Sequence, residues 1–152
     1  MVYLLTGPVQ SGKTTSLVNW SADRNDISGI LTPVINGKRI FLNAATKEEF
    51  PMEAAADETT IITVGRFTFS KHNFEKASQV IREGISQPGW LIIDEIGPVE
   101  LRREGFAAVL NESLSKKNEK ILLVVREGLI QKVQEQFNIT ASIIGLQDLF
   151  RI

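Results

Sequence analysis

Short apolar runs alternate with helical patterns along the chain, and this alternation organises the whole sequence. Most of the runs lack the internal polar alternation of a half-exposed strand, which is typical of strands covered on both faces. Because helical patterns separate several of the runs, the sequence predicts an α/β fold with a mostly parallel sheet between helical layers. The runs that we interpret as strands cover residues 2–6, 27–31, 39–42, 60–64, 90–93 and 121–125.

Apolar residues spaced three and four apart predict the helices. Residues 13–20 form the first of them, and Ser70 is suited to cap the second, because its hydroxyl can accept a backbone N–H at a helix start. A long third helix follows residue 100, and a shorter one precedes residue 138. The positions that define the last three apolar faces are Phe74, Ala77 and Ile81; then Phe106, Val109, Leu110 and Leu114; then Leu129, Val133 and Phe137.

Two features bear on the edges of the sheet. Asn36-Gly37 is the preferred pair for a tight hairpin turn, because both residues tolerate positive φ, so residues 27–44 are expected to form a hairpin. Near the end of the chain, residues 139–146 are expected to form a strand and residues 149–152 a final edge strand. We find no internal repeat and no linker, so residues 1–152 are expected to form a single domain.

Composition narrows the function classes. The 152 residues are 43% hydrophobic and 23% charged, which supplies a real core, and the net charge of -1 gives no global attraction to nucleic acid or to an anionic membrane. Without cysteine, and with His72 as the single histidine, a thiolate or multi-histidine metal centre is excluded. The apolar runs are too short to span a bilayer, and Met1 precedes no basic signal region, so we expect a cytoplasmic protein without a membrane partner.

The strongest motif follows the first strand, where residues 7–14 match G-x-x-x-x-G-K-[ST], the phosphate-binding loop or Walker A motif, between a strand and a helix. Backbone N–H groups of such a loop point at phosphate oxygens, and the helix dipole adds positive potential. Lys13 reaches the terminal phosphates, and the Thr14 hydroxyl is suited to Mg²⁺. The alternative, a glycine turn beside a solvated lysine, is far rarer in this context. The predicted nucleotide-binding residues are Gly7, Pro8, Val9, Gln10, Ser11, Gly12, Lys13, Thr14 and Thr15.

A pair of carboxylates, Asp94 and Glu95, follows the apolar run at residues 91–93. In parallel sheets ligands bind beyond the carboxyl ends of the strands, so we expect the chemistry after Thr6, Val64, Ile93 and Val125. Asp94 at this place, the Walker B position, holds Mg²⁺, and Glu95 orients or deprotonates an attacking water. P-loop proteins with such an Asp-Glu pair have an extra strand between the phosphate-loop strand and the acidic strand.

Arginine residues are the candidates for neutralising the charge that builds on the terminal phosphate. Arg126 ends the 121–125 strand and would lie beside that phosphate if the strand lies between the other two. Arg66 is similarly placed after a predicted strand, whereas Arg39 has no special claim. Arg102 and Arg103 are expected to be solvated near the start of a long helix. Glu100 is expected to favour a helix N-terminus, and Phe67, Phe69 and Phe74 are expected to anchor core and loop rather than to stack on a base.

The two motifs together resemble a known family. Residues 6–8 and 12–15, with Asp94-Glu95-Ile96-Gly97 and Glu100-Leu101, resemble the small P-loop nucleoside triphosphatases of the thermophilic and cancer-related type. The early hairpin, with Gly29, Thr32 and residues 37–39, and the segment 65–67 before Phe74, are similar too. The resemblance implies a RecA-like α/β fold of the additional-strand class, Mg²⁺-dependent hydrolysis of ATP, GTP or another nucleoside triphosphate, and broad base tolerance.

The sequence therefore predicts a nucleoside triphosphatase in which Lys13, Glu95 and Arg126 are catalytic and Thr14 and Asp94 hold the metal. Turnover is expected to be slow, because the sequence contains no dedicated activating element. Two alternatives stay open: a nucleotide or small-molecule kinase with the same phosphate loop, and a nucleotide-dependent regulatory module. A kinase commonly carries an arginine-rich lid, and we find no arginine cluster in one loop. No motif indicates a protein partner.

Overall fold

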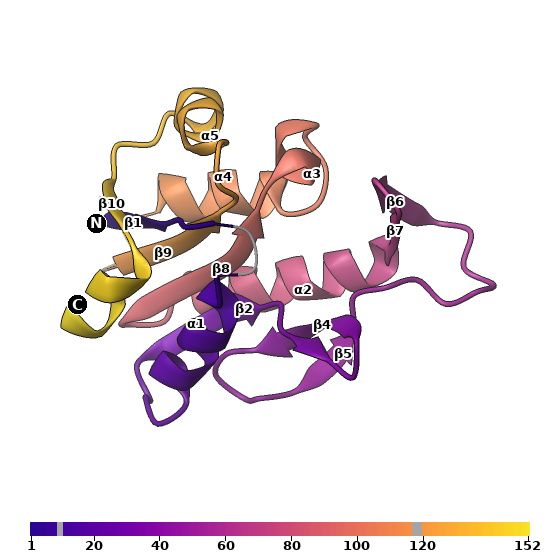
Figure 1. Cartoon of the computed structure of the whole chain (residues 1–152), viewed down its shortest axis with the longest axis horizontal. Helices are drawn as coiled ribbons and strands as arrows, with labels where there is room; N and C mark the ends of the chain where they lie inside the picture. Colours follow the sequence, from indigo (N-terminus) through magenta and orange to yellow (C-terminus); the bar gives the residue numbers. More distant parts are fainter. Residues whose placement is uncertain (9–10, 117–119) are drawn as a thin grey trace.

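The computed structural model describes residues 1–8, 11–116 and 120–152 and has an α/β fold built on one central sheet (Figure 1). The strand order β10-β1-β9-β8-β2-β4-β3 places the phosphate-loop strand and the acidic strand on either side of β9. The pairings β10 to β1, β1 to β9, β9 to β8 and β8 to β2 are all parallel. The strands of this parallel part are β1 (Val2–Leu5), β2 (Ile27–Leu31), β8 (Trp90–Ile96), β9 (Lys120–Val125) and β10 (Ser142–Ile144).

Helical elements cover both faces of this sheet, as the uninterrupted apolar strands require. One face packs against α1 (Lys13–Ser21) and the 3₁₀ helix η1 (Leu146–Arg151), through residues such as Leu17, Trp20 and Leu149. The other face packs against α2 (Lys71–Gly84), α4 (Ala107–Ser115) and α5 (Ile130–Phe137). Neighbouring residues of one strand point to opposite faces of the sheet. Ile93 packs on the face covered by α2, α4 and α5, and Ile92 packs on the face covered by α1 and η1.

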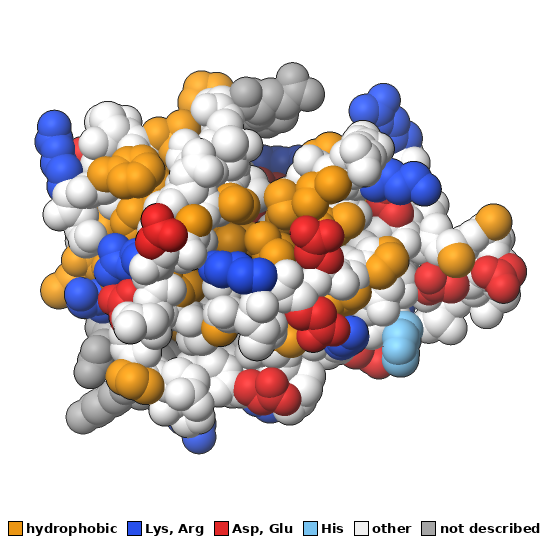
Figure 2. Space-filling view, turned by 90° about the horizontal axis from the view of Figure 1, so that it is seen from below, with side chains coloured by type: hydrophobic (Ala, Val, Ile, Leu, Met, Phe, Trp, Pro, Cys, Tyr) orange, Lys and Arg blue, Asp and Glu red, His pale blue; other side chains and the backbone are white. Residues whose placement is uncertain are grey.

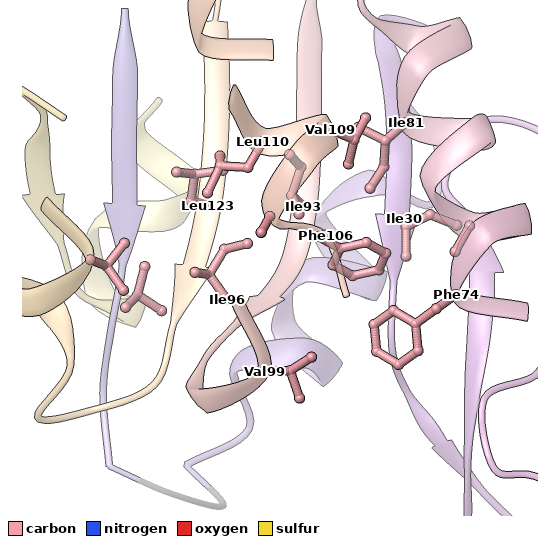
Figure 3. Close-up of a cluster of buried hydrophobic side chains, with 14 of the residues drawn as sticks. Ile30, Phe74, Ile81, Ile93, Ile96, Val99, Phe106, Val109, Leu110 and Leu123 are labelled. Carbon is pink, nitrogen blue, oxygen red and sulfur yellow. The ribbon is translucent and has the colours of Figure 1, made fainter. Parts of the chain in front are cut away.

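Figure 3 shows the larger of the two cores. Ile93 and Ile96 of β8 and Leu123 of β9 lie among side chains from α2 and α4, including Ile81 and Val109, and all five are buried. Burial of such side chains contributes roughly 1.5–3 kcal/mol each. The core therefore holds β8 and β9 side by side as far as their carboxyl ends. The acidic pair lies at the end of β8, and Arg126 directly follows β9.

The start of α2 follows the sequence prediction. The Ser70 hydroxyl accepts the Asn73 backbone N–H at 3.1 Å, so it caps the helix as expected. The predicted long third helix is instead interrupted. A single turn, α3 (Pro98–Leu101), comes first, and Arg102 and Arg103 lie between it and α4, with Arg103 at φ 65°. Both arginines are exposed, as predicted, but in a connection rather than in a helix.

The early hairpin is present with a modified arrangement. Asn36 (φ 52°) and Gly37 (φ 75°) form the tight turn, but it joins β3 (Val34–Ile35) to β4 (Lys38–Asn43) rather than β2 to β4. Strand β4 also pairs antiparallel with β2 and with the short β5 (Glu49–Pro51). The hairpin thus extends the parallel sheet beyond β2.

The predicted strand at residues 60–64 is confirmed as β6 (Ile61–Val64), but its expected place in the central parallel sheet is wrong. Among the described residues β6 pairs with β7 (Phe67–Ser70) alone, in a separate antiparallel hairpin at the far side of Figure 1 from the chain termini. The edge strand predicted at residues 149–152 is wrong: residues 149–151 belong to η1, and Leu149 packs in the core with Leu17 and Trp20. The strand expected at residues 139–146 is confirmed as β10, which pairs with β1.

The surface that Figure 2 shows carries acidic and basic side chains intermixed, with orange apolar side chains between them. This mixture agrees with the net charge near zero. Within the described residues, no helix combines the length and the apolar character that crossing a bilayer requires.

Candidate functional site

The carboxyl ends of β1, β9, β8 and β2 meet at one edge of the sheet, and a cleft of about 420 Å³ lies there. We call it the phosphate cleft. Its lining brings together residues of the glycine motif, the acidic strand, and segments that are far apart in the sequence. The lining residues are Ser11, Gly12, Lys13, Thr14, Thr15, Thr32, Pro33, Val34, Arg39, Arg66, Phe67, Glu95 and Arg126.

The loop before α1 is built as a phosphate-binding loop requires. Gly12 has φ 85°, which strongly favours glycine, and its carbonyl accepts the Ser16 N–H at the start of the helix. The Lys13 ammonium group donates to the carbonyls of Gly7 and Pro8, at 3.0 and 3.1 Å, and the side chain is largely buried. Lysine is thereby held against its own loop. The predicted residues Val9 and Gln10 lie outside the described residues.

Asp94 lies beneath the cleft and is fully buried. Its Oδ2 accepts the Thr14 hydroxyl at 2.9 Å and the Thr32 N–H at 3.1 Å. Burial, and to a smaller extent the neighbouring charge of Glu95, raises the pKa of Asp94 to about 6, although the two hydrogen bonds act in the opposite direction. The hydrogen bond from Thr14 of α1 to Asp94 of β8 therefore joins the two residues that the sequence predicts as metal ligands.

Two buried oxygens at the site have no hydrogen-bond partner among the described residues: Asp94 Oδ1 and Ser11 Oγ. A buried polar atom without a partner carries a penalty that a ligand removes. A carboxylate oxygen and a threonine hydroxyl are hard donors of the kind that Mg²⁺ prefers, with phosphate and water supplying the remaining positions. In the described part of the chain no three His, Cys, Asp or Glu side chains cluster as an all-protein metal cage. Thr14 and Asp94 therefore fit Mg²⁺ held together with a nucleotide.

Glu95 and Arg126 face each other at the edge of the cleft. Their Oε1 and Nε atoms are 3.9 Å apart, and their side chains are 28% and 40% exposed, so both remain accessible to a ligand. Arg126 also donates its backbone N–H to the Ile96 carbonyl at 3.2 Å, which fixes the end of β9 against β8. The sequence predicts Arg126 beside the terminal phosphate only if its strand lies between the phosphate-loop strand and the acidic strand. That condition is met, because β9 lies between β1 and β8.

Glu100 does not line the phosphate cleft. It is buried, and its two carboxylate oxygens accept the N–H groups of Gly97 and Phe106, at 2.9 and 3.0 Å. Desolvation raises the pKa of Glu100 to about 7 despite these bonds, and the charge of Glu95 adds a smaller increase. It acts as a cap at the start of α3, as the sequence predicted.

Sequence reasoning missed Thr32 and Arg39. Thr32 is the first residue after β2, but the hairpin interpretation of residues 27–44 hid that β2 is also a parallel neighbour of β8. Arg39 comes from β4, where nothing in the local pattern indicates a site. Arg66, placed after a predicted strand, lies in the turn between β6 and β7 and still lines the cleft.

Comparison with known proteins agrees with this geometry. A human cancer-related nucleoside triphosphatase, solved in solution, superposes with a TM-score of 0.72 at 20% identity, over 98% of this chain and 93% of that chain. THEP1 from the hyperthermophile Aquifex aeolicus gives a TM-score of 0.73 at 20% identity, over 96% and 90%. No curated protein sequence matches this chain. Such low identities establish the P-loop NTPase fold alone, but the family model described as NTPase matches residues 2–146, and the chain therefore belongs to that NTPase family.

Proposed function

We propose that this protein hydrolyses nucleoside 5'-triphosphates to the diphosphate and phosphate with Mg²⁺, slowly and with broad base tolerance. Membership of the NTPase family supports hydrolysis in general. The observation that carries the finer proposal is the joint placement of Lys13, Thr14, Glu95 and Arg126 around one cleft, with Asp94 beneath it.

Binding would begin with the loop of residues 7–15. Its backbone N–H groups and the start of α1 attract the phosphate chain. Lys13, which donates to its own loop carbonyls in this structure, would exchange these acceptors for phosphate oxygens, a stronger charge-assisted bond. Thr14 and Asp94 would hold Mg²⁺, which would offset part of the charge of the phosphate chain.

In the chemical step, a water oxygen forms a bond to the γ-phosphorus as the bond from that phosphorus to the bridging oxygen breaks. Glu95 orients the water and accepts its proton, which requires the carboxylate form. The charge on the departing and equatorial oxygens is offset by Lys13 and Arg126, which act as fixed cations. Because Arg126 stands 3.9 Å from Glu95, it also keeps that carboxylate near the water position before the nucleotide arrives.

The test is phosphate release from a panel of nucleoside triphosphates, with and without Mg²⁺, alongside nucleotide binding. Glu95→Gln keeps the shape of the side chain and removes the proton acceptor, so we expect phosphate release to fall about 10²- to 10⁴-fold while binding persists. Glu75→Gln, on the exposed side of α2, is the matched control and should behave as wild type.

Each alternative predicts a different result. A kinase would bind the triphosphate and release little free phosphate under any condition; once an acceptor is added it would form the diphosphate and the phosphorylated acceptor. A regulatory module would bind without turnover at any acceptor concentration. Binding without phosphate release in the wild-type protein would therefore refute the proposed hydrolysis. Turnover well above roughly 10 per second, the enzyme median, would refute the slow rate.

A further inference from the structure

The phosphate cleft contains more positive charge than the proposed hydrolysis uses. Four cationic side chains line it, Lys13, Arg39, Arg66 and Arg126, against the single carboxylate of Glu95. Mg²⁺ offsets part of the charge of a bound triphosphate, and Lys13 and Arg126 face the remainder. The positive charges of Arg39 and Arg66 therefore exceed what binding and hydrolysis of the triphosphate require.

These two arginines are held but not neutralised. Their guanidinium carbons lie 5.4 and 5.2 Å from the centre of the Phe67 ring, within cation–π range. Among the described residues neither guanidinium forms an ion pair or donates a hydrogen bond. Arg39 contacts Glu53 only through its backbone N–H, at 2.8 Å. A guanidinium stacked on a ring keeps its N–H edge free, and that edge matches the oxygens of a phosphate group.

Phe67 is itself anchored by a row of aromatic rings. It stacks on Phe69 with ring centres 5.8 Å apart, Phe69 contacts Phe74, and Phe74 contacts Phe106 in the core. These four rings line a second, smaller cavity of about 60 Å³, which we call the aromatic recess. The rings therefore fix the position of the β6–β7 hairpin, and with it that of Arg66, relative to the sheet.

The aromatic recess adjoins the phosphate cleft, because the two share part of their lining. Its size admits only a few non-hydrogen atoms, so a ligand would insert one edge of a planar group and keep the rest in the cleft. The shared residues are Thr32, Arg39, Phe67, Glu95 and Arg126. A second ligand placed there would lie next to the water and γ-phosphate side of the nucleotide, not over the loop of residues 7–15.

We propose that Arg39, Arg66 and Phe67 form a binding site for a second ligand, a phosphate monoester that carries a planar apolar group, as nucleoside monophosphates do. The guanidinium groups bind the monoester phosphate, and the planar group contacts the rings of the aromatic recess. This inference rests on the proposed function, because the second ligand would lie in the same cleft as the triphosphate, beside its terminal phosphate.

The test is titration of AMP into protein already saturated with Mg²⁺ and the β,γ-imido analogue of ATP, which blocks the phosphate loop. AMP should bind to this complex, about tenfold more tightly than ribose 5-phosphate or inorganic phosphate, while adenosine should not bind measurably. Arg39→Gln and Arg66→Gln should each weaken AMP about tenfold, the loss expected for one charge-assisted bond, and should change affinity for the analogue less than twofold. Arg103→Gln, an exposed position outside both linings, is the matched control.

Phe67→Leu retains both charges and removes only the ring, so a loss of about fivefold in AMP affinity is expected if stacking orients the guanidinium groups. Absence of AMP binding to the saturated complex would overturn the inference and leave the proposed function standing. Equal binding of inorganic phosphate and AMP would overturn the ligand class. Loss of analogue affinity in Arg39→Gln and Arg66→Gln would assign these residues to the triphosphate instead. Failure of wild type to bind the analogue would overturn the proposed function and this inference together.

Discussion

Asp94→Asn is expected to stabilise the metal-free protein while it abolishes the magnesium-dependent reaction. The Asp94 carboxylate is fully buried, and one of its oxygens has no partner among the described residues. A buried carboxylate without full hydrogen bonding opposes folding, and natural active sites retain such groups for function. Asparagine has nearly the same shape, and its amide oxygen can still accept from the Thr14 hydroxyl and the Thr32 N–H.

The magnitude follows from the pKa of Asp94, which burial raises from an ordinary 3.8 to about 6. A carboxyl with a raised pKa binds its proton more tightly in the folded state, so its stabilising effect is complete below pH 3.8 and is lost as pH rises through 6. Each pKa unit corresponds to about 1.4 kcal/mol, so the ionised form costs roughly 3 kcal/mol above that range. The unpartnered amide of the variant offsets about 1 kcal/mol of this.

Urea unfolding followed by circular dichroism, in EDTA from pH 4 to 8, measures the effect. At pH 8 the free energy of unfolding of the variant should exceed that of wild type by about 2 kcal/mol, or about 4–8 °C in Tm. The difference should fall to zero near about pH 4.5, and wild type should be slightly the more stable protein at pH 4, where the amide penalty of the variant outweighs the remaining cost of the ionised carboxylate. With Mg²⁺ and a triphosphate, wild type should regain the advantage, because only it gains the full binding energy. A variant less stable than wild type at pH 8 in EDTA, or a difference independent of pH, would refute the desolvation argument.

Three further changes test other parts of the structure. Arg126→Gln should lower phosphate release about 10²-fold with nucleotide binding nearly unchanged, and an equal loss of binding in equilibrium titrations would contradict a role confined to the reaction. Gly29→Ala should destabilise the fold by about 3 kcal/mol or more in urea unfolding, because Gly29 has φ 108° and a Cβ there would meet the backbone of Ile92; a change below 1 kcal/mol would refute this. Glu100→Gln leaves one of two N–H donors without its acceptor and should cost about 1–2 kcal/mol at pH 4.5. Because the pKa of Glu100 is raised to about 7, wild type loses stability from pH 4.5 to 7, so this deficit should shrink over that range in pH-dependent unfolding; a constant deficit would count against it.

The sequence was sufficient for the parts of the fold that local patterns specify. The runs at residues 2–6, 90–93 and 121–125 form strands because continuous apolar residues need cover on both faces, and the glycine motif needs both a strand before it and a helix after it. The order of these strands came from the Asp-Glu pair, through the class of P-loop protein in which such a pair occurs. The observed position of β9 between β1 and β8 confirms that order.

The hairpin at residues 61–70 shows that a strand can be predicted correctly while its sheet is not. Ile61 and Thr63 are exposed while Ile62 is buried, so one face of β6 meets water. This alternation marks a half-exposed strand, whereas a central parallel strand would be apolar throughout. Phe67 and Phe69 continue it on the other side of Gly65-Arg66, a two-residue turn in which Gly65 has φ 57°. In the sequence this alternation appears only in Phe67-Thr68-Phe69-Ser70, because Ile61 and Ile62 are both apolar, so the β-branched run at residues 60–64 indicates a strand of the central sheet.

Arginine placement was beyond the sequence for a different reason. Arg39 comes from β4 in the antiparallel part of the sheet, Arg66 from the turn of an outlying hairpin, and Arg126 from the end of the central strand β9. Only the packing of these three units brings the arginines to one cleft. A search for clustered arginines in one loop therefore found nothing, and that absence favoured water over an acceptor as the partner of the phosphate. Convergent arginines provide the same charge as a contiguous lid. The choice between hydrolysis alone and a reaction with a second bound ligand consequently depends on what Arg39 and Arg66 bind, not on how the arginines are distributed along the chain.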